Sequence, residues 1–354
     1  MSVFIALPSY ASTEINLSGK VTVAAIADSD AEGLGANNLS SVLYAKSGDG
    51  EIKLDTTLTR LNFGTKTDLG NGETIDSFVA FDFNNTNNSE MAVRFREGYV
   101  KWQSGNKTIL AGQTWSTLMD MNAYPSMVLE PTITGVVFTR QPMVRFSQDL
   151  GAVKYDIAVE QSKESTYKGD ETGATNTPDL ILGLETNRDH FWFRATSVVN
   201  QIKVKSDDKK YDELGYGLHL SGGIKFNGKD FWNVSYFNSN GNDRYVLGSN
   251  STSSALLGDT LEASESQGIW TSIGHSWTPR LKSTVGYGLW KSDSLRLNDT
   301  LDQITESEFA LANIKYALRD NLSVGAEYNY TAANKTGYIE RDNHRLILAV
   351  DYVF

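Results

Sequence analysis

The chain has 354 residues, with 43 acidic and 32 basic side chains, a net charge of −11 and no cysteine. The negative charge argues against a general nucleic-acid binder, because such a surface repels phosphate overall. The lack of cysteine excludes a disulfide framework, a zinc-finger spacing and a thiol nucleophile. Outside the first few residues no segment approaches the ~18 consecutive apolar residues of a membrane-spanning helix, which excludes a helical membrane protein.

The amino terminus resembles the end of a signal peptide. Residues 3–7 are apolar, and Ser9, Tyr10 and Ala11 follow the small-x-small pattern of a cleavage site. No Lys or Arg precedes this segment, which leaves two alternatives: the start is placed too far downstream, or the segment is an apolar terminal strand. We expect residues 1–11 to be a signal-peptide remnant and residues 12–354 to form a single domain.

Apolar and polar side chains alternate with a period of two along the whole chain, whereas helical periodicity is nearly absent. Near the carboxyl terminus, Leu346, Leu348 and Val350 share one parity, and Arg345 and Asp351 have the other. This pattern is typical of strands with one apolar face, and it predicts an all-β fold. The expected strands lie near residues 14–28, 57–68, 73–84, 91–102, 107–115, 137–147, 152–162, 179–186, 191–202, 213–226, 231–239, 266–277, 281–291, 306–317, 322–331 and 342–354.

The connections between these sixteen segments alternate between long and short. The long ones are 29–56, 116–136, 163–178, 203–212, 240–265, 292–305 and 332–341, with a shorter Asn-rich one at 85–90. The other seven are tight, and most contain Gly, Asn or Asp, which adopt positive φ at low cost. Transmembrane barrels combine short periplasmic turns, long external loops and an apolar outer face. We therefore predict a 16-stranded antiparallel transmembrane β-barrel.

Two segments carry a resemblance to a known family: LAGQTWST at 110–117 and FTRQPMVRF at 138–146. Here the chain resembles the DcaP-like trimeric porins of the Gram-negative outer membrane. The resemblance implies a homotrimer of sixteen-stranded barrels, an in-folded third loop, a basic constriction and a preference for small organic anions such as dicarboxylates. Members of that family can carry an amino-terminal coiled coil, but no heptad pattern lies between Ala11 and Glu14 here.

The third long connection, 116–136, is unusually apolar for a loop. Such a loop is expected to avoid water, either by folding into the barrel lumen or by packing under neighbouring loops or at a subunit contact. We favour the lumen, largely because of the resemblance. The residues expected to narrow the pore are Met119, Asp120, Met121, Tyr124 and Glu130.

Basic side chains are concentrated in the first half of the expected barrel. They are Arg60, Lys66, Arg94, Arg96, Arg140, Arg145, Lys154 and Arg194. Apolar neighbours such as Phe63 and Phe95 take the outer face, which places most of these basic residues in the lumen. An Arg on the lipid face at mid-bilayer would cost about 2–4 kcal/mol. Arg140 shares the parity of the apolar Val144 and is included because it lies close to the loop.

This basic cluster has two interpretations. Guanidiniums with incomplete carboxylate pairing attract anions in a water-filled lumen and match a carboxylate in a bidentate manner. Alternatively, they pair with carboxylates such as Asp82, Glu97, Asp120, Asp156 or Glu160 and only brace the wall. We favour anion selection. The alternatives are a general-diffusion or carbohydrate porin and, from another class, an outer-membrane enzyme or a surface β-adhesin.

Histidine tests the enzyme alternative, because outer-membrane hydrolases use a Ser–His pair. His190, His219, His275 and His344 are not spaced as metal ligands, and no G-x-S-x-G motif occurs. We therefore expect no catalysis, metal or cofactor. The expected partners are small anionic solutes, the lipid bilayer with its lipopolysaccharide, further copies of the chain, and the outer-membrane assembly machinery, through the carboxyl-terminal Phe354.

Overall fold

The computed structural model describes residues 12–32, 46–84, 92–130, 133–161, 166–168, 171–172, 177–206, 209–249, 253–293, 304–335 and 339–354. The expected signal-peptide remnant, 1–11, lies outside these residues. Within them, only two short 3-10 helices interrupt an otherwise all-β chain, η2 (Met121–Ala123) and η3 (Asp243–Tyr245). No helix in the described ranges is long and apolar enough to cross a membrane.

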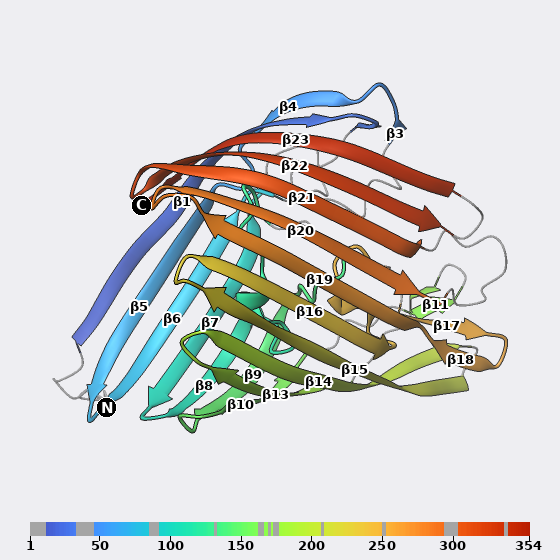
Figure 1. The fold of residues 1–354 in the computed structure, drawn as a ribbon. Helices are drawn as coiled ribbons and strands as arrows, with labels where there is room; N and C mark the ends of the chain where they lie inside the picture. The colour runs from blue at the N-terminus through green and yellow to red at the C-terminus, as the bar shows by residue number, and fades with distance from the viewer. Residues whose placement is uncertain are drawn as a thin grey trace, which may run out of the picture.

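The strands form one large antiparallel sheet that closes on itself (Figure 1). Its first half contains β1 (Ser12–Asp28), β4 (Glu51–Asp55), β5 (Arg60–Gly70), β6 (Glu73–Asp82), β7 (Arg94–Ser104), β8 (Lys107–Trp115), β9 (Arg140–Asp149), β10 (Lys154–Glu160) and β13 (Asp179–Asn187). Its second half contains β14 (Phe191–Ser206), β15 (Lys209–Phe226), β16 (Asp230–Asn240), β19 (Glu265–Ser276), β20 (Leu281–Ser292), β21 (Ile304–Arg319), β22 (Leu322–Lys335) and β23 (Ile339–Val353). β4 and β5 pair with successive parts of β1, so they are two parts of one wall strand. The barrel therefore has the sixteen strands that the sequence predicts.

Pairing of the first strand with the last closes the barrel. β1 runs antiparallel to β23 from Lys20 opposite Val353 to Asp28 opposite Arg345. In Figure 1 the blue amino-terminal strand accordingly meets the red carboxyl-terminal strands. Closure hydrogen-bonds the edges that an open sheet would expose to lipid.

The two faces of the wall differ as the alternation predicts. On β7, Phe95 and Val100 point outward and are about half exposed, whereas Arg96 is buried inside. On β23, Leu346 and Leu348 are exposed outward, and Ile347 between them is buried. The outer face is therefore an apolar belt, and the inner face carries most of the polar groups.

The short turns have the backbone geometry that their residues predict. In the turn between β5 and β6, Gly70, Asn71 and Gly72 all have positive φ, at 80°, 55° and 79°. Only Gly and, at modest cost, Asn adopt this region readily, which is why such pairs build two-residue hairpins.

The expected strand at 57–68 is interrupted. Residues 56–59 leave the wall between β4 and β5, and the fully buried Leu58 points into the barrel. There it packs in one apolar cluster with Val128 and Leu129 of the 116–136 connection. This contact with a distant segment explains why local alternation did not predict the interruption.

The expected long loop at 203–212 is wrong, because β14 and β15 continue through most of it. Inward Ile202 and Val204 pack against Leu256 and Leu261, which lie on β17 (Ser254–Leu257) and β18 (Thr260–Ala263). These partners bury the extended part of the hairpin and stabilise it beyond the membrane-spanning length.

The stretch 240–265 is also more structured than the single external loop predicted. It contains η3 and the β17–β18 hairpin, and β17 pairs with β11 (Thr166–Lys168). With β12 (Glu171–Thr172) these strands form a four-stranded sheet, and a separate two-stranded sheet joins β2 (Ala31–Glu32) to β3 (Lys46–Ser47).

Candidate functional site

The 116–136 connection lies inside the barrel and first binds the inner wall at β14 and β15. The Leu118 carbonyl accepts a hydrogen bond from Thr196 at 2.9 Å. The Asp120 carboxylate accepts hydrogen bonds from Trp192 at 3.1 Å and Ser221 at 2.7 Å. These bonds satisfy polar atoms that a loop would otherwise bury without partners.

The same connection then reaches the wall at β21 and β22. The Val128 amide donates a hydrogen bond to Glu327 at 2.8 Å, and Asn313 donates to the Ser126 carbonyl at 2.7 Å. β14–β15 and β21–β22 are well separated in the order of the sheet. The connection therefore crosses the lumen, as predicted.

The five residues expected to narrow the pore differ in exposure. Met119 and Asp120 are buried, and Tyr124 packs against the ring of Phe138 at 5.4 Å. The Glu130 side chain is mostly buried, at 13% exposed. Met121 is 54% exposed and is the most exposed of the five side chains.

Glu130 joins this connection to three arginines on the wall. Arg94 binds Asp82 through two guanidinium nitrogens, at 2.7 and 2.5 Å. Arg96 lies 2.6 Å from Asp82 and 2.9 Å from Glu130. Arg60 forms an ion pair with the same Glu130. Two carboxylates are thus shared among three guanidiniums.

A β-bulge positions Arg96 in this group. The register between β6 and β7 shifts so that Ala80 faces Glu97 and Phe81 faces Phe95, which leaves Arg96 as the extra residue. Its side chain is only 1% exposed. The bulge directs the guanidinium inward while both phenylalanines stay on the outer face.

Arg140 lies in the same region, at the first position of β9. Its guanidinium carbon is 4.4 Å from the centre of the Trp115 ring, within the range of a cation–π contact. Its charge interacts with those of Arg94 and Arg60. The strand begins at Arg140, so the alternation of later residues in β9 does not fix where its side chain points.

Arg145 differs from these arginines in its partners. It follows the outward Val144 on β9 and is partly exposed on the inner face. Within the described ranges its guanidinium has no hydrogen bond and no ion pair within 4 Å. The nearby carboxylates of Asp156 and Glu160 act on it only at longer range.

The sequence profile of the DcaP outer membrane protein family matches residues 9–354. The chain belongs to this family. Its barrel is similar to the outer-membrane channel DcaP of Acinetobacter baumannii, with 22% identity, a TM-score of 0.86 and 97% of each chain covered. The anion-selective porin of Comamonas acidovorans follows with 8% identity, a TM-score of 0.68 and 97% and 100% covered. OmpF of Salmonella typhi, in complex with daunomycin, has 13% identity, a TM-score of 0.64 and 96% and 97% covered. No protein with a curated description matches the chain.

Membership of the DcaP family places the chain in the outer membrane as a porin, and the sixteen-stranded barrel agrees with its structural neighbours. The resemblance in 110–117 and 138–146 is thereby confirmed. The A. baumannii neighbour is described as an outer membrane channel, and the C. acidovorans neighbour as a porin.

Three of the expected site residues lie apart from the arginine cluster of this DcaP barrel. Arg194 is buried, with Nη1 2.8 Å from both Asp156 and Glu185. Lys154 is 42% exposed and lies 3.8 Å from Asp156. Lys66 is exposed near the β5–β6 turn, six positions along the strand from Arg60, which is roughly 20 Å.

Two inner-face lysines were missing from the sequence prediction. Lys20 on β1 lies opposite Arg60 on the neighbouring strand β5. Lys315 on β21 donates a hydrogen bond to the Met127 carbonyl at 3.0 Å and so holds the 116–136 connection. Both alternate with outward apolar residues, such as Val21 beside Lys20, so the same parity argument could have identified them.

The inner histidine of the DcaP barrel holds the connection in place. His219 is buried, with Nδ1 2.7 Å from the Leu118 carbonyl and Nε2 2.9 Å from Ser235 Oγ. This Ser–His contact lacks a carboxylate on the second ring nitrogen, which a catalytic triad requires. No group of side chains suited to a metal ion occurs in the described part of the chain.

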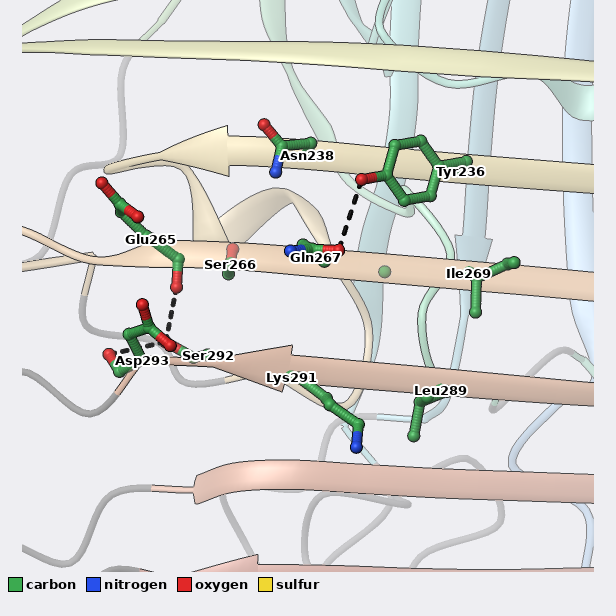
Figure 2. A pocket seen from close by; sticks show the side chains of 11 residues that line it. Tyr236, Asn238, Glu265, Ser266, Gln267, Ile269, Leu289, Lys291, Ser292 and Asp293 are labelled. Carbon is green, nitrogen blue, oxygen red and sulfur yellow. Dashed lines mark hydrogen bonds between the residues drawn. The ribbon is translucent and has the colours of Figure 1, made fainter.

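A groove of about 370 Å³ lies on the outer face of β16, β19 and β20, near their external ends (Figure 2). Its wall includes Tyr236, whose hydroxyl donates to Gln267 at 3.3 Å, together with Ile269 and Lys291. Ile269 has the parity of the apolar belt and is 41% exposed. The groove therefore faces away from the lumen and is separate from the arginine cluster.

Proposed function

We propose that this porin is a passive diffusion channel that favours small organic anions, such as dicarboxylates. The observation that carries the proposal is the balance of charge beside the 116–136 connection. Four arginines gather there, Arg60, Arg94, Arg96 and Arg140. The carboxylates among these four arginines are Asp82, Glu97 and Glu130, which leaves local positive charge in a chain whose net charge is −11. Arg145 lies further along β9, near Asp156 and Glu160.

This arrangement suits transient binding of a carboxylate. Two unit charges about 4 Å apart attract by roughly 4 kcal/mol at an effective dielectric of about 20, before desolvation is subtracted. Such an attraction concentrates an anion at the constriction and still permits its release, as conduction requires. Planar guanidiniums also match the geometry of a carboxylate. A passive channel of this kind needs no cofactor and performs no catalysis.

Comparisons with known proteins support the proposal. The family profile covers nearly the whole sequence, and a porin of similar fold is described as anion-selective. Another neighbour, OmpT of Vibrio cholerae, is described in a trimer form. We propose a homotrimer here as well, with lipopolysaccharide around the apolar belt and residues 1–11 removed on export.

The proposal predicts a specific change in reversal potential. The double variant Arg140→Gln with Arg145→Gln should shift the reversal potential under a salt gradient towards cations. Losing about 1 kcal/mol of anion stabilisation would change the permeability ratio about fivefold. Dicarboxylates should also block the chloride current less strongly. Arg280→Gln, which removes an exposed arginine in the β19–β20 turn, is the matched control.

The assembly and reversal potential of this double variant, and the conductance of the wild-type barrel, also distinguish the anion channel from the other functions considered. A barrel that assembles and keeps the wild-type reversal potential would favour a general-diffusion or carbohydrate porin. Failure to assemble would mean that these arginines brace the wall. Absence of any conductance from assembled wild-type protein would favour the enzyme or adhesin.

A further inference from the structure

A second segment of the chain enters the barrel and pairs with the 116–136 connection. Phe138 donates a backbone hydrogen bond to the Tyr245 carbonyl at 2.7 Å, and Leu247 donates one to the Val136 carbonyl at 3.0 Å. Between these bonds, Val137 and Val246 form an isolated antiparallel bridge. Residues 242–248, hereafter the inner latch, are therefore a short strand partner for the returning arm of the connection.

The inner latch is fixed to the wall through buried side chains. Tyr245 is fully buried; its hydroxyl donates to Asp179 at 2.7 Å and accepts from Gln141 at 2.8 Å. Burial raises the pKa of this hydroxyl well above its ordinary value, so it stays protonated and able to donate. Arg244 binds the same Asp179 at 2.6 Å and stacks on the Tyr245 ring at 4.3 Å.

Further bonds hold both ends of the inner latch. At one end, the Asp243 carboxylate accepts hydrogen bonds from Ser264 at 2.7 Å and Ser266 at 2.6 Å. At the other end, Ser307 on β21 donates to the Gly248 carbonyl at 2.7 Å. The segment thus runs from Asp179 on β13 to β21, across the interior.

We propose that the inner latch sets the open cross-section of the channel by fixing the returning arm of the 116–136 connection, residues 133–138, inside the barrel beside β19 and β20. The wall bonds of Leu118, Asp120, Ser126 and Val128 fix only the outgoing part of that connection. The backbone–backbone hydrogen bonds of the returning arm at Gly135, Val136 and Phe138 go to the latch instead. Its side chains Ile133 and Val136 also pack on Trp270 and Phe309 of the wall, and the Val137 carbonyl accepts a hydrogen bond from Tyr124. Loosening the latch should therefore let this arm move and widen the pore.

The proposal rests on the channel activity of the family and not on anion preference, so the two can fail separately. Single-channel conductance and current noise measure the effect of loosening the inner latch. Reversal potential reports selectivity and should stay at the wild-type value when only the latch is loosened.

The first experiment loosens the latch with Arg244→Gln and Tyr245→Phe, which remove its ion pair and hydroxyl without removing the ring. The variant should assemble, with the same heat-modifiable gel mobility, and show a higher single-channel conductance with more current noise. Tyr236→Phe is the matched control, because it removes a tyrosine hydrogen bond on the outer groove (Figure 2). Wild-type conductance and noise in the assembled latch variant would overturn the proposal.

A disulfide tests the pairing independently, because the chain has no cysteine of its own. Val137 and Val246 form a pair without mutual backbone bonds, whose Cα atoms lie about 4.5 Å apart, within the disulfide range of about 4.4–6.8 Å. Val137→Cys with Val246→Cys should form a disulfide in the membrane and keep wild-type conductance. Added to the latch variant, the disulfide should restore that conductance, and reduction should abolish the effect. Two thiols that stay free under oxidant in the assembled barrel would also overturn the proposal.

Discussion

At the scale of single residues, the partners of each arginine determine what it contributes. Arg94 and Arg96 are held by Asp82, whereas Arg145 has no ion pair in the described ranges. A paired guanidinium fixes geometry but offers a solute less net charge than an unpaired one. Anion attraction should therefore come mainly from residues such as Arg145, and rigidity from the paired arginines.

Arg194 provides the test of the bracing role. Its guanidinium binds Asp156, Glu185 and the Thr117 carbonyl, the last at 2.8 Å. Arg194→Gln would leave the buried Asp156 without this partner, so the free energy of unfolding should fall by about 3–5 kcal/mol. Urea unfolding of the refolded barrel measures this, and the reversal potential should hardly change.

Arg145→Gln is the control for Arg194→Gln and should give the opposite pattern, with altered reversal potential and little change in stability. A stable Arg194→Gln barrel with altered selectivity would assign Arg194 to the anion path instead of the wall.

Strand parity explains how much of this site the sequence could predict. The outward Leu61, Phe95 and Val144 correctly indicated that their basic neighbours face inward. Parity could not reveal that Glu130 binds Arg60 and Arg96, because a residue in a loop has no fixed register with the wall. It also does not extend to the first residue of a strand, which is why Arg140 was uncertain.

At the scale of elements, the two segments that enter the lumen differ in how clearly the sequence predicts their position. The 116–136 connection contains Met119, Met127 and Leu129, which are too apolar for an external loop. The stretch 240–265 is rich in Gly, Ser and Asn and looked external. Its inward part depends on backbone bonds and on one buried aromatic residue, Tyr245, and neither produces a periodic pattern.

Deletion of residues 122–130 tests the first of these elements. The deletion removes the part of the 116–136 connection that crosses the lumen, including Tyr124 and Glu130. Single-channel conductance should therefore rise clearly above the wild-type value. The wall should still form, because its strand pairs do not involve these residues. Planar-bilayer recording measures conductance, and heat-modifiable mobility checks assembly.

Glu130→Gln is the milder companion variant, since it removes only the ion pairs to Arg60 and Arg96. It should give an intermediate increase in conductance. Unchanged conductance in an assembled deletion variant would mean that the connection does not limit the pore.

At the scale of the whole molecule, alternation and turn lengths were enough to predict the barrel. Sixteen strands and their order follow from a period of two and from short turns at one end only. The position of the third loop in the lumen follows largely from the resemblance to the DcaP-like porins. The extension of β14 and β15 did not follow, because it depends on packing against β17 and β18. Local pattern thus determines the membrane-spanning wall, and contacts between distant segments determine what lies above and within it.

The seam between the first and last strands makes the carboxyl terminus important for assembly. The Phe354 amide donates to the Gly19 carbonyl at 3.0 Å, and the Gly19 amide donates to the Phe354 carbonyl at 2.9 Å. The Phe354 ring lies on the apolar outer face, stacked with Tyr352 at 6.4 Å. This residue thus takes part both in closing the barrel and in the alternating apolar series that we expect the assembly machinery to bind.

Deleting Phe354 should therefore lower the amount of assembled barrel in the outer membrane, measured as the heat-modifiable fraction. Phe354→Ala keeps the two seam hydrogen bonds and removes only the ring, so it separates recognition from closure. Phe226→Ala is its control, because Phe226 is another outward ring at the same end of the barrel, 46% exposed against 44% for Phe354. If recognition of the terminal ring matters, Phe354→Ala should reduce assembly in cells more than Phe226→Ala, while both refold equally well in detergent. Wild-type assembly of the deletion variant would show that the seam closes without its last residue and that no assembly signal resides there.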